Sequence, residues 1–346
     1  MLELHAVEGA FEAIEAWLVE RGFFAPGGED LVADLYLGYG LSGPLRRIDA
    51  PAPPEPCPLP LAVVALADRS RALSPGPVSI GRWERTWSEA EYAAAVEEVR
   101  AAIACGDVYQ VNLVQHLSAP FEGDPRAVAA ALAQFRPVAP FLAGEGWAIV
   151  SASPELFLGR RGRRIWTMPI KGTRKLGVPV EGAKDAAEHV MIVDLERNDL
   201  SRVCEPGSVR WPELMAEREL AGVTHLVSTV EGMLREGVTL AEILHATFPG
   251  GSVTGAPKIA ALDEIARLEP VGRGASMGAL GSVRGNGDLD LALTIRTFAV
   301  ADGRIHLWVG GGIVWDSDPE AEIEESWTKA RPLLAAVGAP IEAGAR

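Results

Sequence analysis

Several segments with strand-like patterns follow one another without a helix between them, and this arrangement constrains the fold most. These patterns occupy residues 108–117, 146–153, 155–170, 289–300 and 304–315. Parallel neighbours need a long crossover connection, usually a helix, whereas antiparallel neighbours can be joined directly. The order of the patterns therefore predicts an α+β fold with antiparallel pairing, not a doubly wound parallel sheet.

Helical patterns separate the groups of strands. Residues 88–107 begin with Ser88 and Glu91 in the spacing of a capping box, which predicts the start of a helix. Further helical patterns cover residues 182–200, 239–247, 255–268 and 318–337. For the last of these, Ser317 and Glu320 form the expected capping box.

The chain of 346 residues is 48% hydrophobic and can bury a large core, as one domain with an appendage or as two domains. Its first part carries an amphipathic stretch at residues 11–24 and a proline-rich stretch at residues 49–67. Proline at this density predicts a linker or an extended wall rather than a helix.

The overall charge limits the partners. With 47 acidic and 32 basic residues the formal charge is −15, which argues against nucleic acid or an anionic membrane. No apolar run reaches the about 20 residues that span a bilayer, and the N-terminus carries acids where a secretory signal carries bases. We expect a cytoplasmic protein, with Cys57, Cys105 and Cys204 reduced because their spacing fits neither a zinc site nor a CxxC pair.

Two glycine-rich stretches are candidates for anion binding. Residues 248–258, "FPGGSVTGAPK", lead into a helix expected to begin near Ala256 and Pro257, where free backbone N–H groups and the helix dipole suit a carboxylate or phosphate. The stretch lacks the Lys-Ser/Thr pair of a P-loop, and a plain connection is an equal alternative. Gly310 to Gly312 are expected to form a second turn with backbone access to a ligand.

Two pairs of acids are spaced three residues apart on predicted helices: Asp185 with Glu188, and Glu322 with Glu325. Members of each pair share a helix face. Solvated acidic faces explain most such pairs. If both pairs faced one cavity, however, they would offer the oxygen-rich site that Mg²⁺ prefers.

Glu155 and Lys171 lie sixteen residues apart, each beside an apolar strand pattern. A carboxyl group whose pKa is raised by burial can act as a general acid, and a desolvated neutral lysine can act as an amine nucleophile. The alternatives are an exposed turn lysine and a surface Glu–Lys pair.

Eight motifs occur in the order found in the chorismate-binding enzymes, which the sequence resembles from about residue 86 to residue 337. They are "GDVYQVNL", "SPELFL", "PIKGTR", "DLERNDLSRV", "HLVSTVEG", "FPGGSVTGAPK", "LTIRTF" and "GGGIVWDSDPEAEIEES". The resemblance implies an α+β fold with a layered core of antiparallel β-sheets, outer helices and an active-site cleft. It divides the chain into an N-terminal segment with the proline-rich linker, residues 1–85, in the same globule as a catalytic domain at residues 86–340.

Two positions distinguish branches of this family. Isochorismate-forming members have a water-activating lysine where this chain has Gln110, and anthranilate-forming members have alanine where it has Lys171. The resemblance therefore implies the aminodeoxychorismate-forming branch, which feeds 4-aminobenzoate and folate synthesis. In that branch Lys171 attacks C2 of chorismate, Glu155 protonates the departing C4 hydroxyl, and ammonia adds at C4.

The resemblance also assigns the remaining roles. Glu188 and Glu325 match Mg²⁺ ligands, with Asp185 and Glu322 as nearby or water-mediated partners. Arg296 matches the residue that grips the enolpyruvyl carboxylate, and His225 an orienting histidine near the reacting hydroxyl. Substrate contacts are further implied for Gln110, Thr173, Gly251, Ser252, Thr254, Lys258, Gly310, Gly311 and Gly312. Ser282 stands where many members carry a substrate-holding tyrosine.

Glutamine hydrolysis has no counterpart in the sequence, which shows no Cys-His-Glu constellation with a nucleophile elbow. The resemblance thus implies that a separate glutamine amidotransferase subunit supplies the ammonia. Two alternatives remain open at this point: an anthranilate-forming enzyme, and a chorismate-binding protein without catalytic activity.

Overall fold

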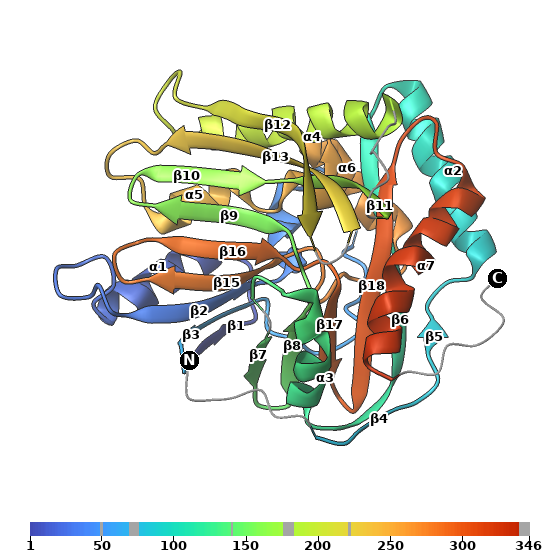
Figure 1. The fold of residues 1–346 in the computed structure, drawn as a ribbon, viewed down its shortest axis with the longest axis horizontal. Helices are drawn as coiled ribbons and strands as arrows, with labels where there is room; N and C mark the ends of the chain where they lie inside the picture. The colour runs from blue at the N-terminus through green and yellow to red at the C-terminus, as the bar shows by residue number, and fades with distance from the viewer. Residues whose placement is uncertain (49–50, 69–75, 140, 176–182, 221–222, 339–346) are drawn as a thin grey trace.

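The computed structural model describes residues 1–48, 51–68, 76–139, 141–175, 183–220 and 223–338, and shows two β-sheets flanked by helices (Figure 1). Every strand pair in the described residues is antiparallel, which confirms the predicted α+β fold.

The larger sheet has the strand order β1–β3–β2–β15–β16–β9–β10–β13–β11, with β12 paired to β13. Its strands are β1 (Leu2–Leu4), β2 (Val32–Leu37), β3 (Ala62–Leu66), β9 (Leu156–Arg161), β10 (Arg164–Met168), β11 (Ile170–Lys175), β12 (Arg210–Leu220), β13 (Val223–Met233), β15 (Ala279–Arg284) and β16 (Leu289–Leu293).

The second sheet has the order β14–β6–β18–β17–β8–β7, with the short strands β4 and β5 also paired to β6. Its strands are β4 (Val78–Ile80), β5 (Glu84–Arg85), β6 (Gln110–Gly123), β7 (Phe141–Gly144), β8 (Trp147–Ser151), β14 (Gly255–Ala256), β17 (Thr297–Ala301) and β18 (Arg304–Ile313).

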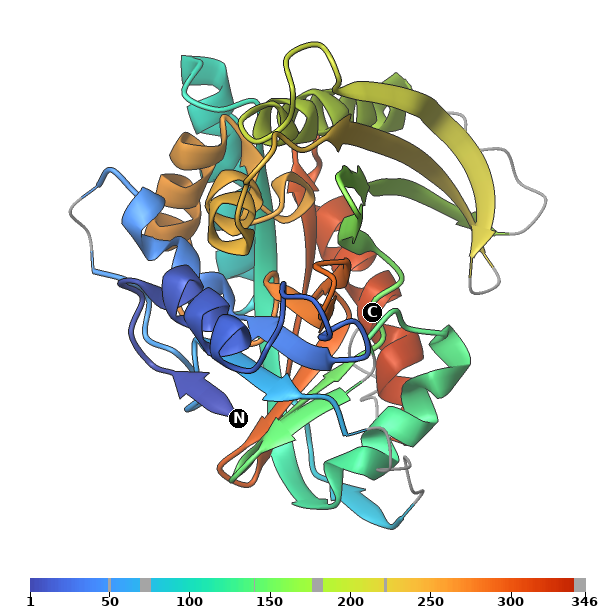
Figure 2. The same cartoon turned by 90° about the vertical axis from the view of Figure 1, so that its left-hand side faces the viewer.

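The helices lie outside the sheets (Figure 2). They are α1 (Ala10–Glu20), α2 (Glu89–Cys105), α3 (Pro125–Leu132), α4 (Ala183–Ser201), α5 (Leu240–Thr247), α6 (Lys258–Leu268) and α7 (Pro319–Ala336), with 3₁₀ turns η1 (Tyr39–Leu45), η2 (Ala133–Phe135) and η3 (Gly251–Val253). Helix α4 packs on β11 and β13, whereas α7 packs on β18 and on α2.

Three hydrophobic clusters hold these layers together. The largest joins both sheets with α1 and α5, and includes the buried Ile14, Leu35 and Ile149. A second lies between the smaller sheet, α3 and α7, and a third between α2, α6 and β6. Each fully buried leucine or isoleucine side chain contributes about 1.5–3 kcal/mol.

The N-terminal residues are part of the larger sheet. Strand β2 pairs with β15 along its whole length, from Val32 opposite Arg284 to Leu37 opposite Ala279. This is the arrangement expected for an N-terminal segment in the same globule, and the domain boundary near residue 85 stays a prediction.

Helix starts follow the sequence signals at one site and depart from them at another. The capping box of Ser88 and Glu91 is confirmed at α2. The predicted box of Ser317 and Glu320 is wrong, because Asp318 caps α7 by accepting from the Ala321 N–H. The Ser317 hydroxyl instead donates to Glu322 Oε1 at 2.6 Å.

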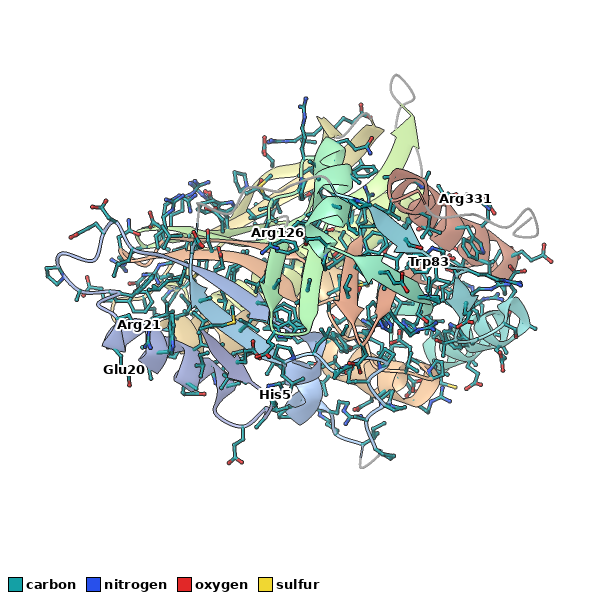
Figure 3. All side chains as sticks on the ribbon, turned by 90° about the horizontal axis from the view of Figure 1, so that it is seen from below. His5, Glu20, Arg21, Trp83, Arg126 and Arg331 are labelled. Atoms are coloured by element: carbon teal, nitrogen blue, oxygen red, sulfur yellow. The ribbon has the colours of Figure 1, made fainter. Side chains whose placement is uncertain are left out.

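Long charged side chains lie over aromatic rings at the surface. Figure 3 labels Arg21 near the N-terminal helix and Arg126 on α3, whose guanidinium groups lie 3.9 Å from the ring centre of Trp17 and 5.7 Å from that of Phe141.

No helix within the described ranges combines the length and apolar composition needed to cross a membrane.

A buried histidine pair joins β6 and β18. His116 Nε2 and His306 Nδ1 lie 3.0 Å apart, and His116 Nδ1 lies 2.6 Å from Thr86 Oγ1. Burial lowers the pKa of His116 to about 3, helped by the charges of His306 and Arg304, and burial likewise lowers the pKa of His306 to about 4. Both rings are therefore neutral in the folded protein.

We predict that acidification destabilises the fold through this pair. Below pH 6.5 both histidines are protonated in the unfolded chain but stay neutral in the folded protein, because their unfolded-state pKa is about 6.5. The free energy of unfolding therefore falls by about 2 kcal/mol per histidine between pH 6.5 and 4.5. Urea unfolding at several pH values measures this slope. The slope should flatten in His306→Gln, which removes one of the two buried rings. An unchanged slope in His306→Gln would contradict the assignment.

Candidate active site at the junction of the two sheets

Two connections that cross from one sheet to the other lie next to each other. The chain leaves β8 for β9 through residues 152–155 and leaves β16 for β17 through residues 294–296. The Ala152 N–H donates to the Arg296 carbonyl and the Leu293 N–H to the Glu155 carbonyl, both at 3.0 Å. These two bonds place Glu155 and Arg296 side by side. The single strand pattern predicted at 289–300 is therefore two strands, β16 and β17, separated by residues 294–296.

Arg296 has an unusual backbone and an available guanidinium. Its φ of 51° lies in the left-handed region, which costs a non-glycine residue of order 1 kcal/mol or more and is often found at functional sites. Burial lowers its pKa, and the charge of Glu155 opposes this. The guanidinium has no hydrogen-bond or ion-pair partner among the residues that the structure describes, so it can receive a carboxylate.

Glu155 is buried at the same junction, with a relative exposure of 4%. Burial raises the pKa of its carboxyl, while the charge of Lys171, a hydrogen bond from Ser252 and the Ile170 N–H lower it. Its Oε1 has no hydrogen-bond partner within the described part of the chain. A buried carboxyl group with a raised pKa has the property that a general acid requires.

Lys171 lies on β11, and its amine donates to Glu188 Oε1 at 2.7 Å. Both side chains are nearly buried, at 13% and 12% exposure. Burial alone would lower the pKa of Lys171, but Glu188, Glu155 and Glu325 together raise it. The expectation of a neutral amine is therefore wrong for this state, because the fold brings three acids to a lysine that has none nearby in sequence.

The three glycines lie inside strand β18, so the predicted turn at Gly310 to Gly312 is wrong. Gly312 is opposite Asn112 of β6, and a Cβ on it would lie 2.5 Å from Glu188 Oε1. A Cβ on Gly311 would lie 3.2 Å from Glu325 Oε1 and 3.4 Å from Glu322 Oε2. These positions lack side chains where acids from α4 and α7 approach the same strand.

The predicted magnesium ligands converge only in part. Gln110 Nε2 donates to Glu188 Oε1 at 2.9 Å, and Lys329 Nζ pairs with Glu325 Oε1 at 2.7 Å. No group of three potential ligands is close enough to hold a metal among the described side chains. The acids nevertheless supply hard oxygen donors, and Mg²⁺ usually keeps several waters, so this donor set fits Mg²⁺ with some rearrangement.

The turn at η3 lies against Glu155 and α4. Gly251 and Ser252 are buried in it, and the Thr254 hydroxyl donates to the Gly250 carbonyl at 3.0 Å, which fixes the turn. A Cβ on Gly251 would lie 2.8 Å from Leu195 Cδ2, so the glycine permits close packing of α4. Substrate contacts by these residues stay a prediction.

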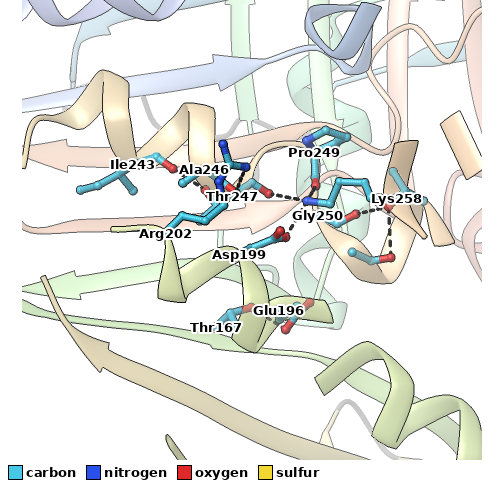
Figure 4. Close-up of polar contacts among 12 residues, drawn as sticks. Thr167, Glu196, Asp199, Arg202, Ile243, Ala246, Thr247, Pro249, Gly250 and Lys258 are labelled. Carbon is cyan, nitrogen blue, oxygen red and sulfur yellow. Dashed lines mark hydrogen bonds and ion pairs between the residues drawn. The ribbon is translucent and has the colours of Figure 1, made fainter. Parts of the chain in front are cut away.

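Lys258 stabilises this turn from behind (Figure 4). Its amine donates to Asp199 Oδ2 at 2.6 Å, to the Pro249 carbonyl at 2.7 Å and to the Thr247 carbonyl at 3.2 Å. These three acceptors use all three of its N–H donors. These contacts show that Lys258 has a structural role, whereas its direct contact with substrate stays a prediction.

Three predicted positions have side chains outside the described residues. They are Thr173, Asp185 and His225, although the backbones of Thr173 and His225 pair across β11 and β13. Ser282 lies opposite Asp290, three residues along the sheet from the pairing at Leu293. That is about 10 Å along the strand.

Sequence reasoning missed two buried residues of α4. His189 Nε2 lies 2.6 Å from Ser228 Oγ, and burial lowers its pKa to about 4, helped by the charge of Lys171. Glu196 accepts a hydrogen bond from Thr167. A search for acids on the helix face of Glu188 could have found Glu196, since eight residues correspond to slightly more than two turns.

A profile of the family described as chorismate binding enzyme matches residues 53–335. The chain belongs to the chorismate-binding enzymes. Its Glu155 and Arg296, which lie side by side, thus belong to a member of a family of chorismate-binding enzymes.

Related proteins support this membership. Anthranilate synthase component 1 of Thermus thermophilus is 44% identical over 280 residues, which are 76% of this chain and 60% of that protein. Aminodeoxychorismate synthase component 1 of Klebsiella aerogenes is 41% identical over 265 residues, or 73% and 59%. Anthranilate synthase component I from Streptococcus pneumoniae has a similar solved structure, with a TM-score of 0.79 at 26% identity, covering 92% of this chain and 84% of that one. The chain spans about three fifths of the length of the two curated relatives.

We predict that Lys258→Met destabilises the protein by about 3–5 kcal/mol, because Asp199 loses its cation while it remains buried. Urea unfolding at pH 7 measures the change. Arg197→Met is the control, since Arg197 forms an exposed pair with Asp194 on the same helix and should cost about 0–1 kcal/mol. If Lys258→Met lowers the free energy of unfolding no more than the control does, but strongly weakens chorismate binding, Lys258 would be a substrate-binding residue instead.

Proposed function

We propose that this enzyme is an aminodeoxychorismate synthase component I, which converts chorismate and ammonia to 4-amino-4-deoxychorismate for 4-aminobenzoate and folate synthesis. The observation that carries the proposal is the position of Lys171, an amine in ion-pair contact with Glu188 and within electrostatic reach of Glu155. The anthranilate-forming branch, as the resemblance to the family implies, has alanine at this position.

Anthranilate synthase component I is the second candidate. Relatives with that name and with the name aminodeoxychorismate synthase component 1 are similar to this chain at 44% and 41% identity, a difference too small to decide. Gln110 argues against a third reaction, isochorismate formation, because an amide cannot act as the base that activates water.

The proposed reaction divides between Lys171 and Glu155. Once it has released its proton to solvent, Lys171 forms a bond to C2 of chorismate, both ring double bonds shift, and the C4 hydroxyl leaves as water with the proton of Glu155. Ammonia then forms a bond to C4, both double bonds shift back, and Lys171 leaves C2. Arg296 holds the enolpyruvyl carboxylate, which stays on the product.

Magnesium would be held by Glu188 and Glu325, with Glu322 and Asp185 as further or water-mediated partners. When bound, the ion would bind the ring carboxylate and would neutralise the acids that otherwise keep Lys171 protonated. Ammonia would come from a separate glutamine amidotransferase subunit. The component 1 names of the relatives suggest a second subunit.

The test is to incubate the purified chain with chorismate, Mg²⁺ and an ammonium salt, and to identify the product by mass spectrometry. We expect aminodeoxychorismate, which retains the enolpyruvyl group, and no product when glutamine replaces ammonium. Anthranilate, which has lost that group as pyruvate, would favour the second candidate, and turnover of glutamine by the chain alone would remove the need for a partner.

We predict that Lys171→Ala lowers the rate of product formation by at least about 100-fold, the lower range for a positioned catalytic group. Lys171→Arg should be equally inactive, since a guanidinium stays protonated and cannot attack carbon. Steady-state kinetics and chorismate binding separate chemistry from affinity, with Arg126→Ala on the surface helix α3 as control. Substantial activity in Lys171→Arg would indicate an electrostatic part for this lysine instead.

A further inference from the structure

Residues 52–55 of the proline-rich stretch form one wall of a cavity whose lining includes none of Glu155, Lys171 and Arg296. The other walls are the 3₁₀ turn η1, helix α6 and the turn at residues 271–273. The volume of the cavity is about 70 Å³. This is roughly half of the about 150 Å³ that accepts benzene in an apolar protein cavity, so the interior has room for about three carbon atoms.

Hydrogen bonds fix the walls of this cavity. The Gly272 N–H donates to the Pro54 carbonyl at 2.9 Å, which joins the proline-rich stretch to the turn after α6. Asp263 Oδ1 on α6 accepts from the Arg47 N–H at 2.9 Å, which anchors the chain just after η1. The space between these segments is therefore formed before any ligand binds.

Most of the cavity lining is apolar. Leu262 and Ile265 of α6 are buried, and Ala266, Val271 and Pro53 complete the apolar surface. An aliphatic group placed against these side chains leaves water without losing a hydrogen bond. The interior therefore suits a small aliphatic group.

Two of the four charged residues in the lining neutralise each other. Arg273 and Glu269 are buried, and Arg273 Nη2 donates to Glu269 Oε1 at 2.7 Å. Arg273 also donates to the carbonyls of Val253 and Asn112, at 2.8 and 2.7 Å. This pair is therefore satisfied within the protein, and it joins the cavity wall to the η3 turn and to β6.

The other two charged residues, Arg46 and Glu55, have hydrogen-bonding capacity to spare. Arg46 Nη1 is buried and has no hydrogen-bond partner among the described residues. Glu55 is exposed, and its Oε2 accepts from the Gly274 N–H at 2.9 Å, which leaves Oε1 available. Its carboxylate lies beside Gly272, where a Cβ would collide with it. The cavity thus presents one positive and one negative group next to an apolar interior.

We propose that this cavity binds an α-amino acid with a short branched aliphatic side chain, such as valine. The carboxylate of the ligand accepts from Arg46, its ammonium group donates to Glu55, and its three side-chain carbons fill the apolar interior. A simple carboxylate or a simple amine satisfies only one of the two charged residues. An aromatic side chain such as that of tryptophan exceeds the volume.

The first test is a ligand-observed NMR titration of the purified chain with valine, which needs neither chorismate nor ammonium and so does not depend on the proposed function. We expect a Kd of about 1 mM or tighter, the range of a ligand with few non-hydrogen atoms. Isovalerate lacks the ammonium group of valine and isobutylamine lacks its carboxylate, so each should bind at least about tenfold more weakly. Absence of valine binding at millimolar concentrations, or equal binding of the three compounds, would overturn the proposal.

Substitutions of the two charged residues assign the two ends of the ligand. Arg46→Met should weaken valine binding at least about tenfold but leave isobutylamine unaffected, because only valine has a carboxylate. Glu55→Gln keeps an acceptor for the Gly274 N–H and removes the charge, so it should weaken binding of valine but not of isovalerate. Arg47→Met is the matched control, since Arg47 is exposed and its side chain does not line the cavity. Equal losses in Arg46→Met and in this control would contradict the assignment.

A substitution in the interior ties binding to this cavity. Ala266 is half-buried on α6, so Ala266→Leu should fill the space and abolish valine binding. Valine binding that persists in this variant would place the ligand elsewhere and overturn the proposal. Displacement of valine by tryptophan in the wild type would contradict the size of ligand inferred from the volume.

Discussion

Two backbone hydrogen bonds at the junction of the sheets place Glu155 and Arg296 side by side, and the rest of the site is arranged around these two residues. The bonds join the connection before β9 to the connection after β16, through Ala152 with Arg296 and Leu293 with Glu155. Because neither connection belongs to a sheet, its side chains can face the gap between the layers instead of a neighbouring strand. A buried carboxyl group and a buried guanidinium are thereby fixed without a flexible loop, at the cost of left-handed backbone at Arg296.

Charge is the second constraint on this site. The site brings Glu155, Glu188 and Glu325 within electrostatic reach of Lys171, in a chain of net charge −15. In the structure that amine is protonated and paired, which stabilises the buried acids. A protonated amine has no lone pair and cannot act as a nucleophile. Catalysis by Lys171 therefore requires that another cation neutralise these acids. The glycines of β18 let those acids lie close to the strand backbone, and their hard oxygen donors would suit magnesium as the other positive partner.

Helix α4 connects the candidate active site to the η3 turn. Its inward face carries Glu188 at the lysine, Glu196 beside Thr167 and Asp199 against Lys258. One rigid helix therefore fixes the carboxylate expected to bind metal relative to the turn that Asp199 and Lys258 stabilise.

The sequence by itself determined the class of fold and the identity of the main groups. Adjacent strand patterns without helices required antiparallel sheets, and the local signals at Ser88 and Glu91 were sufficient because a capping box depends on residues three positions apart. Family motifs selected Glu155, Lys171 and Arg296. Tertiary structure alone decided their state. Protonation of Lys171 depends on acids from other elements, the glycines of β18 were mistaken for a turn because their pairing with β6 is long-range, and Glu196 became visible only when helix packing buried it beside a cavity. Local propensity acts over a few residues, whereas charge balance and burial depend on segments that only the fold brings together.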